Sequence, residues 1–124
     1  MSNDILIESL EQISKSSKRI LKRFESVNDV DYFLDSEEGL EKLDAICMQL
    51  IAIGEGLKSI DKITDKKLLS KHHHINWKAA KGIRDIISHH YFDLDAEAIY
   101  DVCENDIEPL QKTIDHIING LNNK

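Results

Sequence analysis

Apolar residues recur every three or four positions along most of the chain, which is the spacing of amphipathic α-helices. A first helix is predicted at about residues 4–25, where Asn3 or Asp4 can cap its start. A second is predicted at about residues 37–60, with Ser36 as its N-cap. Three more are predicted in the second half of the chain, so the pattern favours an all-α fold.

The predicted helix at 37–60 is the most apolar, and it carries two stripes. One runs from Leu40 to Leu57 at a spacing of three to four residues, and three isoleucines, each seven positions after the last, form the other. Two stripes indicate burial from two sides, by the core on one side and by a second subunit on the other. Gly54 and Gly56 weaken the helix but permit close approach of another helix or a ligand.

Short connections separate the first three predicted helices. Asp29 can cap one helical turn that ends at Phe33. Residues 61–75 are predicted to form a basic connection with about one turn near Leu68.

Polar residues mark the ends of the last three predicted helices. Asn76 is predicted to cap the third helix and Asp95 the fourth. The fifth has Pro109 in its first turn, where the missing N–H costs least, and Gly120 is predicted to end it. We therefore expect one domain, residues 1–124, built as an up-and-down bundle of four to five helices.

The distribution of charge adds a possible function to this fold. The chain of 124 residues has a net charge of −7, which argues against a protein that coats nucleic acid in general. However, residues 15–23 hold five basic residues and no acid, and residues 62–84 hold seven lysines and arginines against one acid. These two basic blocks are either solvated helix faces or part of a local basic groove on an acidic protein.

Targeting signals and cysteine usage indicate where the protein resides. The first residues, MSNDILIESLEQ, contain acids and no long apolar run, so no secretory signal is expected. No window approaches the roughly 18–20 apolar residues of a membrane span. Cys47 and Cys103 form no C-x-x-C pair, so we expect reduced thiols on helices. Together these features predict a cytoplasmic protein with no membrane partner.

The stretch GIRDIISHHYFDLD crowds titratable side chains next to residues that belong in a core. On a continuous helix, Arg84, Ser88 and Tyr91 lie on one face, whereas His89 lies about 140° from Arg84. For His89 to act beside Arg84, the helix should end near residues 88–90. The loop that follows would then redirect the side chains.

Arginine, histidine and tyrosine together suit a particular chemistry. Arginine is a permanent planar cation that binds phosphate, histidine titrates near neutral pH, and tyrosine offers a stacking ring and a modifiable hydroxyl. The set suits phosphodiester cleavage without a metal, with histidine as acid or base and arginine stabilising the phosphorane-like charge. The plain alternative is a polar helix end, where Arg84 and His89 serve as a cap and a salt bridge.

Read as R-x-x-x-x-H-x-Y, these residues resemble the signature of the HEPN superfamily, in particular of the HepT-like toxins of HepT/MntA toxin–antitoxin pairs. IAIGEGLK at 51–58 resembles the Gly-Glu helix segment of that family. INWKAAKGIRDIISHHYFDLD at 75–95 resembles its Trp-to-acid block, and AIYDVCENDIEPLQ at 98–111 its closing helices. The segment KHHHI at 71–75 departs from the family, which places proline or small apolar residues before the tryptophan.

The resemblance implies a small helical bundle that pairs as a homodimer, with the Arg/His motifs of two subunits facing one cleft. It implies metal-independent endoribonuclease activity on tRNA or mRNA, with no cofactor. It also implies a protein partner, a MntA-like nucleotidyltransferase antitoxin that transfers AMP from ATP onto the motif tyrosine. By position, Arg84 and His89 would be catalytic and Tyr91 would accept AMP.

Other residues near the motif are candidates for support or for RNA binding. Glu55 either orients Arg84 or is an ordinary surface glutamate. Ser88 shares a helix face with Arg84, and His90 is either a second proton-transfer group or a surface residue. Lys78 and Lys81 belong to the second basic block, which would flank the cleft, and the first basic block could extend it.

Two aromatic features have plainer explanations than a site. His72–His74 form a histidine tract, but adjacent histidines rarely supply a closed metal site, so an exposed basic loop is expected and no metal. Trp77 is expected to pack in the core or in a dimer interface. Neither feature adds a catalytic group to the motif.

Two functions remain open on this sequence. The first is a ribonuclease toxin, controlled by a nucleotidyltransferase antitoxin. The second is a non-catalytic HEPN partner or substrate-binding subunit of a nucleotidyltransferase. The set of Arg84, His89 and Tyr91 favours the first, because a scaffold has no need of a proton-transfer histidine. A purely structural helical dimer ranks last, since it makes the three residues accidental.

Overall fold

The computed structural model describes residues 2–89 and 95–123, with side chains for 3–88 and 95–123. The described residues contain no β-strand, so the prediction of an all-α fold is confirmed. The helices are α1 (Ser2–Phe24), α2 (Asp31–Asp35), α3 (Glu37–Thr64), a 3-10 turn (Leu69–Lys71), α4 (Trp77–His89), α5 (Ala96–Asn105) and α6 (Ile107–Asn122). None of the described helices combines the length and the apolar character that a bilayer crossing needs.

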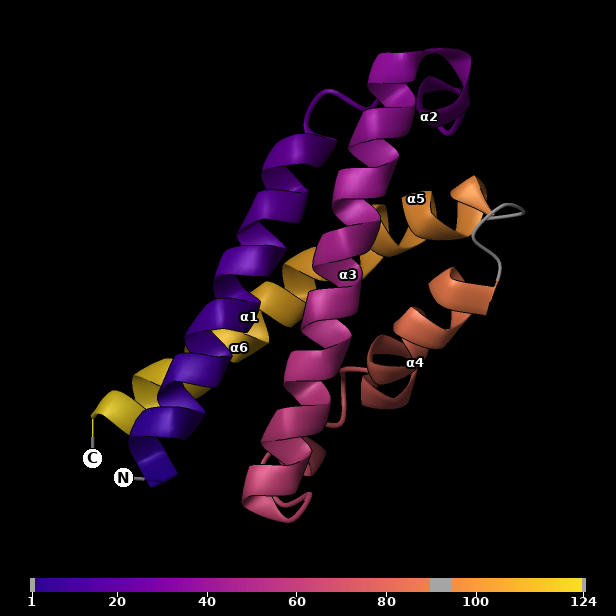
Figure 1. Ribbon diagram of the computed structural model, residues 1–124. Coiled ribbons are helices and arrows are strands. Elements are labelled where there is room, and N and C mark those ends of the chain that lie inside the picture. Colours follow the sequence, from indigo (N-terminus) through magenta and orange to yellow (C-terminus); the bar gives the residue numbers. More distant parts are fainter. Residues whose placement is uncertain (1, 90–94, 124) are drawn as a thin grey trace.

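The two longest helices, α1 and α3, run antiparallel at the centre of the bundle (Figure 1). α6 packs against α1, and α4 packs against α3. α2 forms the corner between α1 and α3, and the short α5 leads into α6. Four main helices with two short additions therefore form the up-and-down bundle that the sequence predicts.

Side-chain caps fix the starts of three helices. Ser36 Oγ accepts a hydrogen bond from the Gly39 backbone N–H at 3.0 Å, and Asn76 Oδ1 accepts one from Ala79 at 3.0 Å. Asp95 Oδ1 accepts two backbone N–H groups from the first turn of α5, at 3.0 and 3.2 Å. The predicted caps Ser36, Asn76 and Asp95 are confirmed, and each is worth about 1 kcal/mol of helix stability.

Two helix ends differ from the prediction. α3 continues to Thr64, about one turn beyond its predicted end, and the chain then turns at Asp65 and Lys66, whose φ angles are 54° and 60°. α6 continues through Gly120 to Asn122, so the predicted stop at Gly120 is wrong. No described glycine has a positive φ, so Gly120 does not adopt the left-handed conformation of a glycine cap.

Both apolar stripes of α3 are buried within the chain itself. Ile46, Ile53 and Ile60, the second stripe, are at most 2% exposed. Since α1 and α4 both pack against α3, helices of the same chain cover it from two sides. The expectation that a second subunit covers one stripe is therefore wrong. Among the residues of the two stripes, only Leu40, near the start of the helix, is substantially exposed.

Three residues of the core behave as the sequence indicates. Trp77 is buried, and its indole N–H donates a hydrogen bond to the carbonyl oxygen of His72 at 2.9 Å. Cys47 and Cys103 are buried free thiols. Burial, with a smaller effect of the Asp44 carboxylate, raises the pKa of Cys47 to about 12, and burial likewise raises the pKa of Cys103 to about 12. Both thiols therefore stay protonated at neutral pH.

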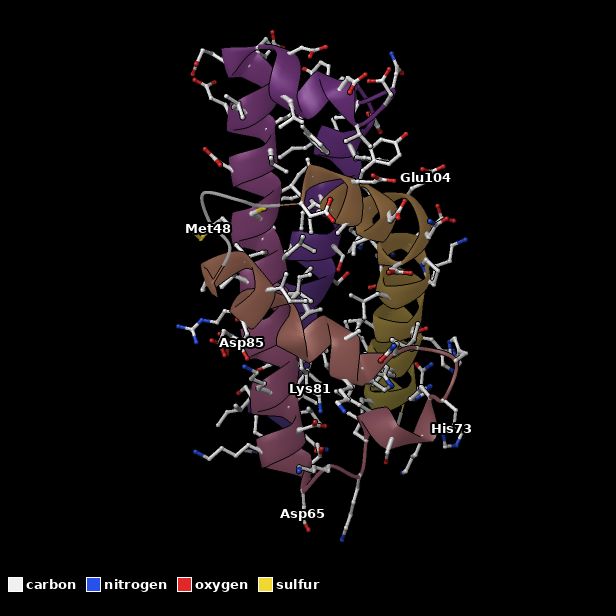
Figure 2. All side chains as sticks on the ribbon, turned by 90° about the vertical axis from the view of Figure 1, so that its right-hand side faces the viewer. Met48, Asp65, His73, Lys81, Asp85 and Glu104 are labelled. Atoms are coloured by element: carbon white, nitrogen blue, oxygen red, sulfur yellow. The ribbon has the colours of Figure 1, made fainter. Side chains whose placement is uncertain are left out.

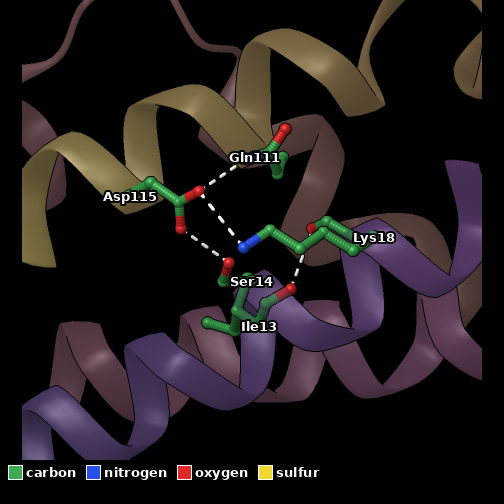
Figure 3. A network of polar contacts seen from close by, with 6 residues as sticks. Ile13, Ser14, Lys18, Gln111 and Asp115 are labelled. Carbon is green, nitrogen blue, oxygen red and sulfur yellow. Dashed lines mark hydrogen bonds and ion pairs between the residues drawn. The ribbon is translucent and has the colours of Figure 1, made fainter.

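A polar network joins α1 to α6 (Figure 3). Asp115 accepts hydrogen bonds from Ser14 Oγ at 2.6 Å and from Gln111 Nε2 at 2.5 Å, and the Lys18 ammonium lies 3.5 Å from it. Burial raises the pKa of the Asp115 carboxyl, but the bonds from Ser14 and Gln111 and the charge of Lys18 outweigh burial and lower it. The network therefore favours the ionised carboxylate and holds α6 in register with α1.

Candidate functional site

α4 lies close against α3 because Gly54 has no side chain at the contact. A Cβ atom at Gly54 would lie 3.2 Å from the carbonyl oxygen of Ala80 and 3.4 Å from that of Lys81. Both oxygens belong to the backbone of α4, which cannot turn aside as a flexible side chain can. The predicted role of Gly54 in the close approach of another helix is confirmed, and we call this contact the α3–α4 seam.

Two ion pairs cross the α3–α4 seam. Arg84 Nε lies 3.1 Å from Glu55 Oε1, and Lys81 Nζ lies 2.5 Å from Asp61 Oδ2. Figure 2 shows Lys81 where α4 crosses in front of α3. Asp61 is buried, so removing Lys81 would leave a poorly solvated charge. The sequence did not suggest Asp61 as a neighbour of the motif, because its partner Lys81 lies 20 positions away on another helix.

The Glu55–Arg84 ion pair is more exposed than the Lys81–Asp61 ion pair. Half of the Arg84 side chain and 46% of the Glu55 side chain are accessible. An exposed ion pair adds at most about 1 kcal/mol of stability, so its main effect is to orient the guanidinium. Lys58 lies 4.0 Å from the other oxygen of Glu55. The seam thus presents an oriented and accessible guanidinium, the group best suited to bind phosphate.

The remainder of the motif follows Arg84 in the sequence and is only partly described by the structure. α4 is described as far as His89, and Ser88 before it is exposed. The expectation that the helix ends near residues 88–90 depends on residues outside the described range and stays a prediction. The His89 side chain, and all of His90 and Tyr91, lie outside the described residues. The roles assigned to these three residues therefore stay predictions.

Lys78 lies on the other flank of α4. Together with Ile86 it lines a mainly apolar hollow of about 730 Å³ between α4 and the pair of helices α5 and α6. Lys81 and Arg84, in contrast, contact carboxylates of α3. The structure therefore brings Glu55, Lys81 and Arg84 together at the seam and separates Lys78 from them.

The histidine tract that precedes α4 contacts α6. His74 Nε2 lies 2.9 Å from Thr113 Oγ1, and the ring centroids of His72 and His116 are 6.3 Å apart. The expectation of an exposed loop is confirmed for His73, which Figure 2 shows at the edge of the molecule, but it is wrong for the half-buried His72. Burial, followed by the neighbouring imidazoles, lowers the pKa of His72. Within the described ranges, no group of three His, Cys, Asp or Glu residues could hold a metal ion.

Known proteins similar to this chain carry ribonuclease names. "Putative RNase TTE0752" of Caldanaerobacter subterraneus subsp. tengcongensis is 26% identical over 88% of this chain and 90% of its own length. "Putative RNase MJ1216" of Methanocaldococcus jannaschii is 28% identical over 86% of this chain and 94% of its own length. "Putative RNase MJ0127" of the same organism is 30% identical over 62% of this chain and 60% of its own length. No solved structure matches the chain.

A family model agrees with these relatives. The family described as "Ribonuclease HepT-like" matches residues 6–117, which include all of α3 and α4 and the ion pair between Glu55 and Arg84. The predicted family and the predicted enzyme class are confirmed at the level of the family. From the first helix of the bundle to the last, the chain belongs to the HepT-like family of ribonucleases.

Proposed function

We propose that the chain is the toxin of a toxin–antitoxin pair and acts as a metal-independent endoribonuclease on tRNA or mRNA. The observation that supports this most strongly is the accessible Arg84 guanidinium, which Glu55 holds at 3.1 Å. Arg84 lies about one and a half turns before His89, the last described residue of α4. An oriented cation and a histidine that follows it on the same helix supply the two groups that this chemistry needs.

The proposed reaction is an internal transfer at phosphorus. His89 removes the proton of the 2′-OH, and the 2′-oxygen attacks the adjacent phosphorus. The bond from phosphorus to the 5′-oxygen breaks, and a protonated histidine returns a proton to that oxygen. Arg84 stabilises the additional negative charge of the phosphorane-like transition state. The products are a 2′,3′-cyclic phosphate and a 5′-hydroxyl.

The proposed active form is a homodimer. One reaction needs a base and an acid, and each chain contributes one motif histidine, His89. If two copies of the motif face one cleft, one His89 can act as the base while the other acts as the acid. Dimerisation would therefore complete the site.

The proposed control acts on Tyr91. A nucleotidyltransferase antitoxin would direct the Tyr91 hydroxyl oxygen onto the α-phosphorus of ATP, so that AMP is transferred and pyrophosphate leaves. The adenylyl group adds one negative phosphodiester and a bulky purine near Arg84. It would occupy the place of the RNA phosphate and repel the RNA backbone.

A cleavage assay tests the proposal. Purified wild-type protein and His89→Ala are incubated with total tRNA in EDTA, and the fragment ends are mapped. Mass spectrometry establishes that both proteins are free of AMP. We expect only the wild type to cut, leaving cyclic phosphate ends, with a loss of about 100-fold or more in the variant.

Two results would contradict the proposal in different ways. Equal cleavage by His89→Ala and the wild type would exclude His89 from the chemistry. No cleavage by unmodified wild-type protein would favour the alternative, a non-catalytic partner or substrate-binding subunit of a nucleotidyltransferase.

A further inference from the structure

A groove of about 610 Å³ runs between α1 and α3. The two helices approach closely at its base, where a Cβ atom at Gly56 would lie 2.9 Å from Ile13 Cγ1. Most of the residues that line it carry hydroxyl, amide or charged groups, among them Gln12, Lys15, Ser16, Arg19, Gln49 and Ser59. A groove lined by these groups, with two cations among them, suits a polyanion.

The structure divides the first basic block, residues 15–23, between several surfaces. Lys18 lies 3.5 Å from Asp115 of α6, and Lys22 lies 3.8 Å from Glu25. Lys15 and Arg19 are four residues apart, so they share one side of α1, and both line the groove. The sequence block is thus reduced to two cations that face a concave surface.

The groove reaches the α3–α4 seam through Glu55. Glu55 lines the groove, and the same side chain binds Arg84 at 3.1 Å and lies 4.0 Å from Lys58. Its negative charge is therefore shared by two cations, which leaves Lys15 and Arg19 to set the sign of the groove. A polyanion held in the groove would extend toward the Arg84 guanidinium.

We propose that the groove between α1 and α3 binds the sugar–phosphate backbone of single-stranded RNA and leads it to or from Arg84. Lys15 and Arg19 hold phosphates, while the serine and glutamine side chains contact phosphate oxygens and 2′-hydroxyls. This rests on the proposed function, and it adds a binding track outside the reacting groups.

The lining also indicates how the RNA is recognised. None of the described residues that line the groove is aromatic, so it offers no ring on which bases can stack. Contacts to the backbone carry no direct sequence information. The groove therefore increases affinity for long RNA and leaves the choice of cleavage position to the site around Arg84.

Salt-dependent binding tests the groove. The affinity of full-length protein for a fluorescent single-stranded RNA is measured by anisotropy in EDTA over a series of salt concentrations. For the double variant Lys15→Gln/Arg19→Gln we expect binding about tenfold weaker or worse. The slope of log affinity against log salt should become shallower by about 1.4, because each phosphate contact on a single strand contributes about 0.7.

Lys112→Gln is the matched control. Lys112 is an exposed lysine of α6 that pairs with Glu108 at 2.8 Å and does not line the groove, so this variant should retain the wild-type affinity and slope. Circular dichroism verifies that all variants fold. If the double variant misfolds, the single variants Lys15→Gln and Arg19→Gln replace it, each with half the change in slope.

The outcomes separate this proposal from the proposed function. If the folded variants bind RNA with the wild-type affinity and salt slope, the proposal that the groove binds RNA is wrong, even if the protein cleaves RNA normally. Binding that depends on Lys15 and Arg19 in a wild-type protein that cleaves nothing would support the groove and overturn the ribonuclease mechanism. If the variants change the sedimentation of the protein and not the salt slope, the groove is an interface between two copies and the proposal is wrong.

Discussion

The seam between α1 and α6 and the α3–α4 seam use a carboxylate in opposite ways. Asp115 receives hydrogen bonds from Ser14 and Gln111 as well as the charge of Lys18, so its partners are fixed by the fold. Glu55 instead holds an arginine that remains half exposed. The two carboxylates differ moderately in exposure, 32% against 46%, so exposure alone does not separate them. The difference lies in the partners: one set satisfies the carboxylate, and the other presents a cation to solvent.

Removing the cation from each seam should give the largest contrast. Arg84→Ala is expected to reduce RNA cleavage about 100- to 1000-fold, since in the proposed mechanism Arg84 stabilises the transition-state charge. Lys18→Ala, the matched change at the other seam, should leave cleavage within about twofold. Initial rates on tRNA, with melting curves for both proteins, measure this. Equal losses in the two variants would mean that Arg84 acts only through the fold.

Removing the Asp115 carboxylate from the contact between α1 and α6 should lower the stability of the protein and leave its cleavage activity unchanged. Asp115→Ala leaves Ser14 and Gln111 without their acceptor, so we expect a loss of about 1–3 kcal/mol in the free energy of unfolding. Urea titration measures the loss. Cleavage at a temperature where the variant stays folded should match the wild type, and a drop there would connect this network to the site.

Glu55→Gln, at the α3–α4 seam, should lower cleavage activity and leave stability nearly unchanged. The amide keeps the size of the side chain but loses the charge that orients Arg84, so we expect kcat to fall about tenfold. KM should stay constant or decrease, because a negative charge beside the RNA phosphate is gone. The free energy of unfolding should change by less than about 1 kcal/mol. Unchanged kcat in steady-state assays would make Glu55 an ordinary surface residue.

Acid should reduce the stability that Asp115 contributes at the contact between α1 and α6. The pKa of its carboxyl is lowered in the folded protein, so its contribution to stability is present above the unfolded value of about 3.9 and is lost as the pH falls through the folded value. Asp115→Asn removes this contribution. The difference in unfolding free energy between the variant and the wild type should therefore shrink below about pH 4. A difference that stays constant across the acid range would contradict the sign.

The smallest effect concerns the two glycines of the seam region. A Cβ at Gly82 meets nothing within 4 Å, so Gly82→Ala should stabilise α4 by about 0.5–1 kcal/mol without changing cleavage. Gly54→Ala brings a similar helix preference but presses on the backbone of α4, so its main effect should be a loss of cleavage as Arg84 shifts. Thermal melts and initial rates of both variants compare the two. Cleavage that survives Gly54→Ala would show that the seam tolerates displacement.

Local features of the fold could be predicted from the sequence, and contacts between distant residues could not. Caps such as Ser36 and Asp95 act within one turn, so the residue types alone indicate them. The stop at Gly120 was predicted from the same kind of local rule and is wrong, because the helix has no need of a left-handed residue there. The sequence left Glu55 either as a residue that orients Arg84 or as an ordinary surface glutamate, and the structure pairs the two side chains at 3.1 Å. The contact of His74 with Thr113, 39 positions later, depends on how helices pack.

The two buried thiols can report local opening of the bundle. Cys47 lies on α3 and Cys103 on α5, and both are protonated and inaccessible while the helices stay packed. An alkylating reagent can therefore react only during the fraction of time in which the surrounding helices separate. The labelling rate of each native cysteine therefore measures how often the helices around it open, and no probe has to be introduced. Comparing the labelling rates of both cysteines with and without RNA would measure how far RNA binding reduces the local opening of the helices.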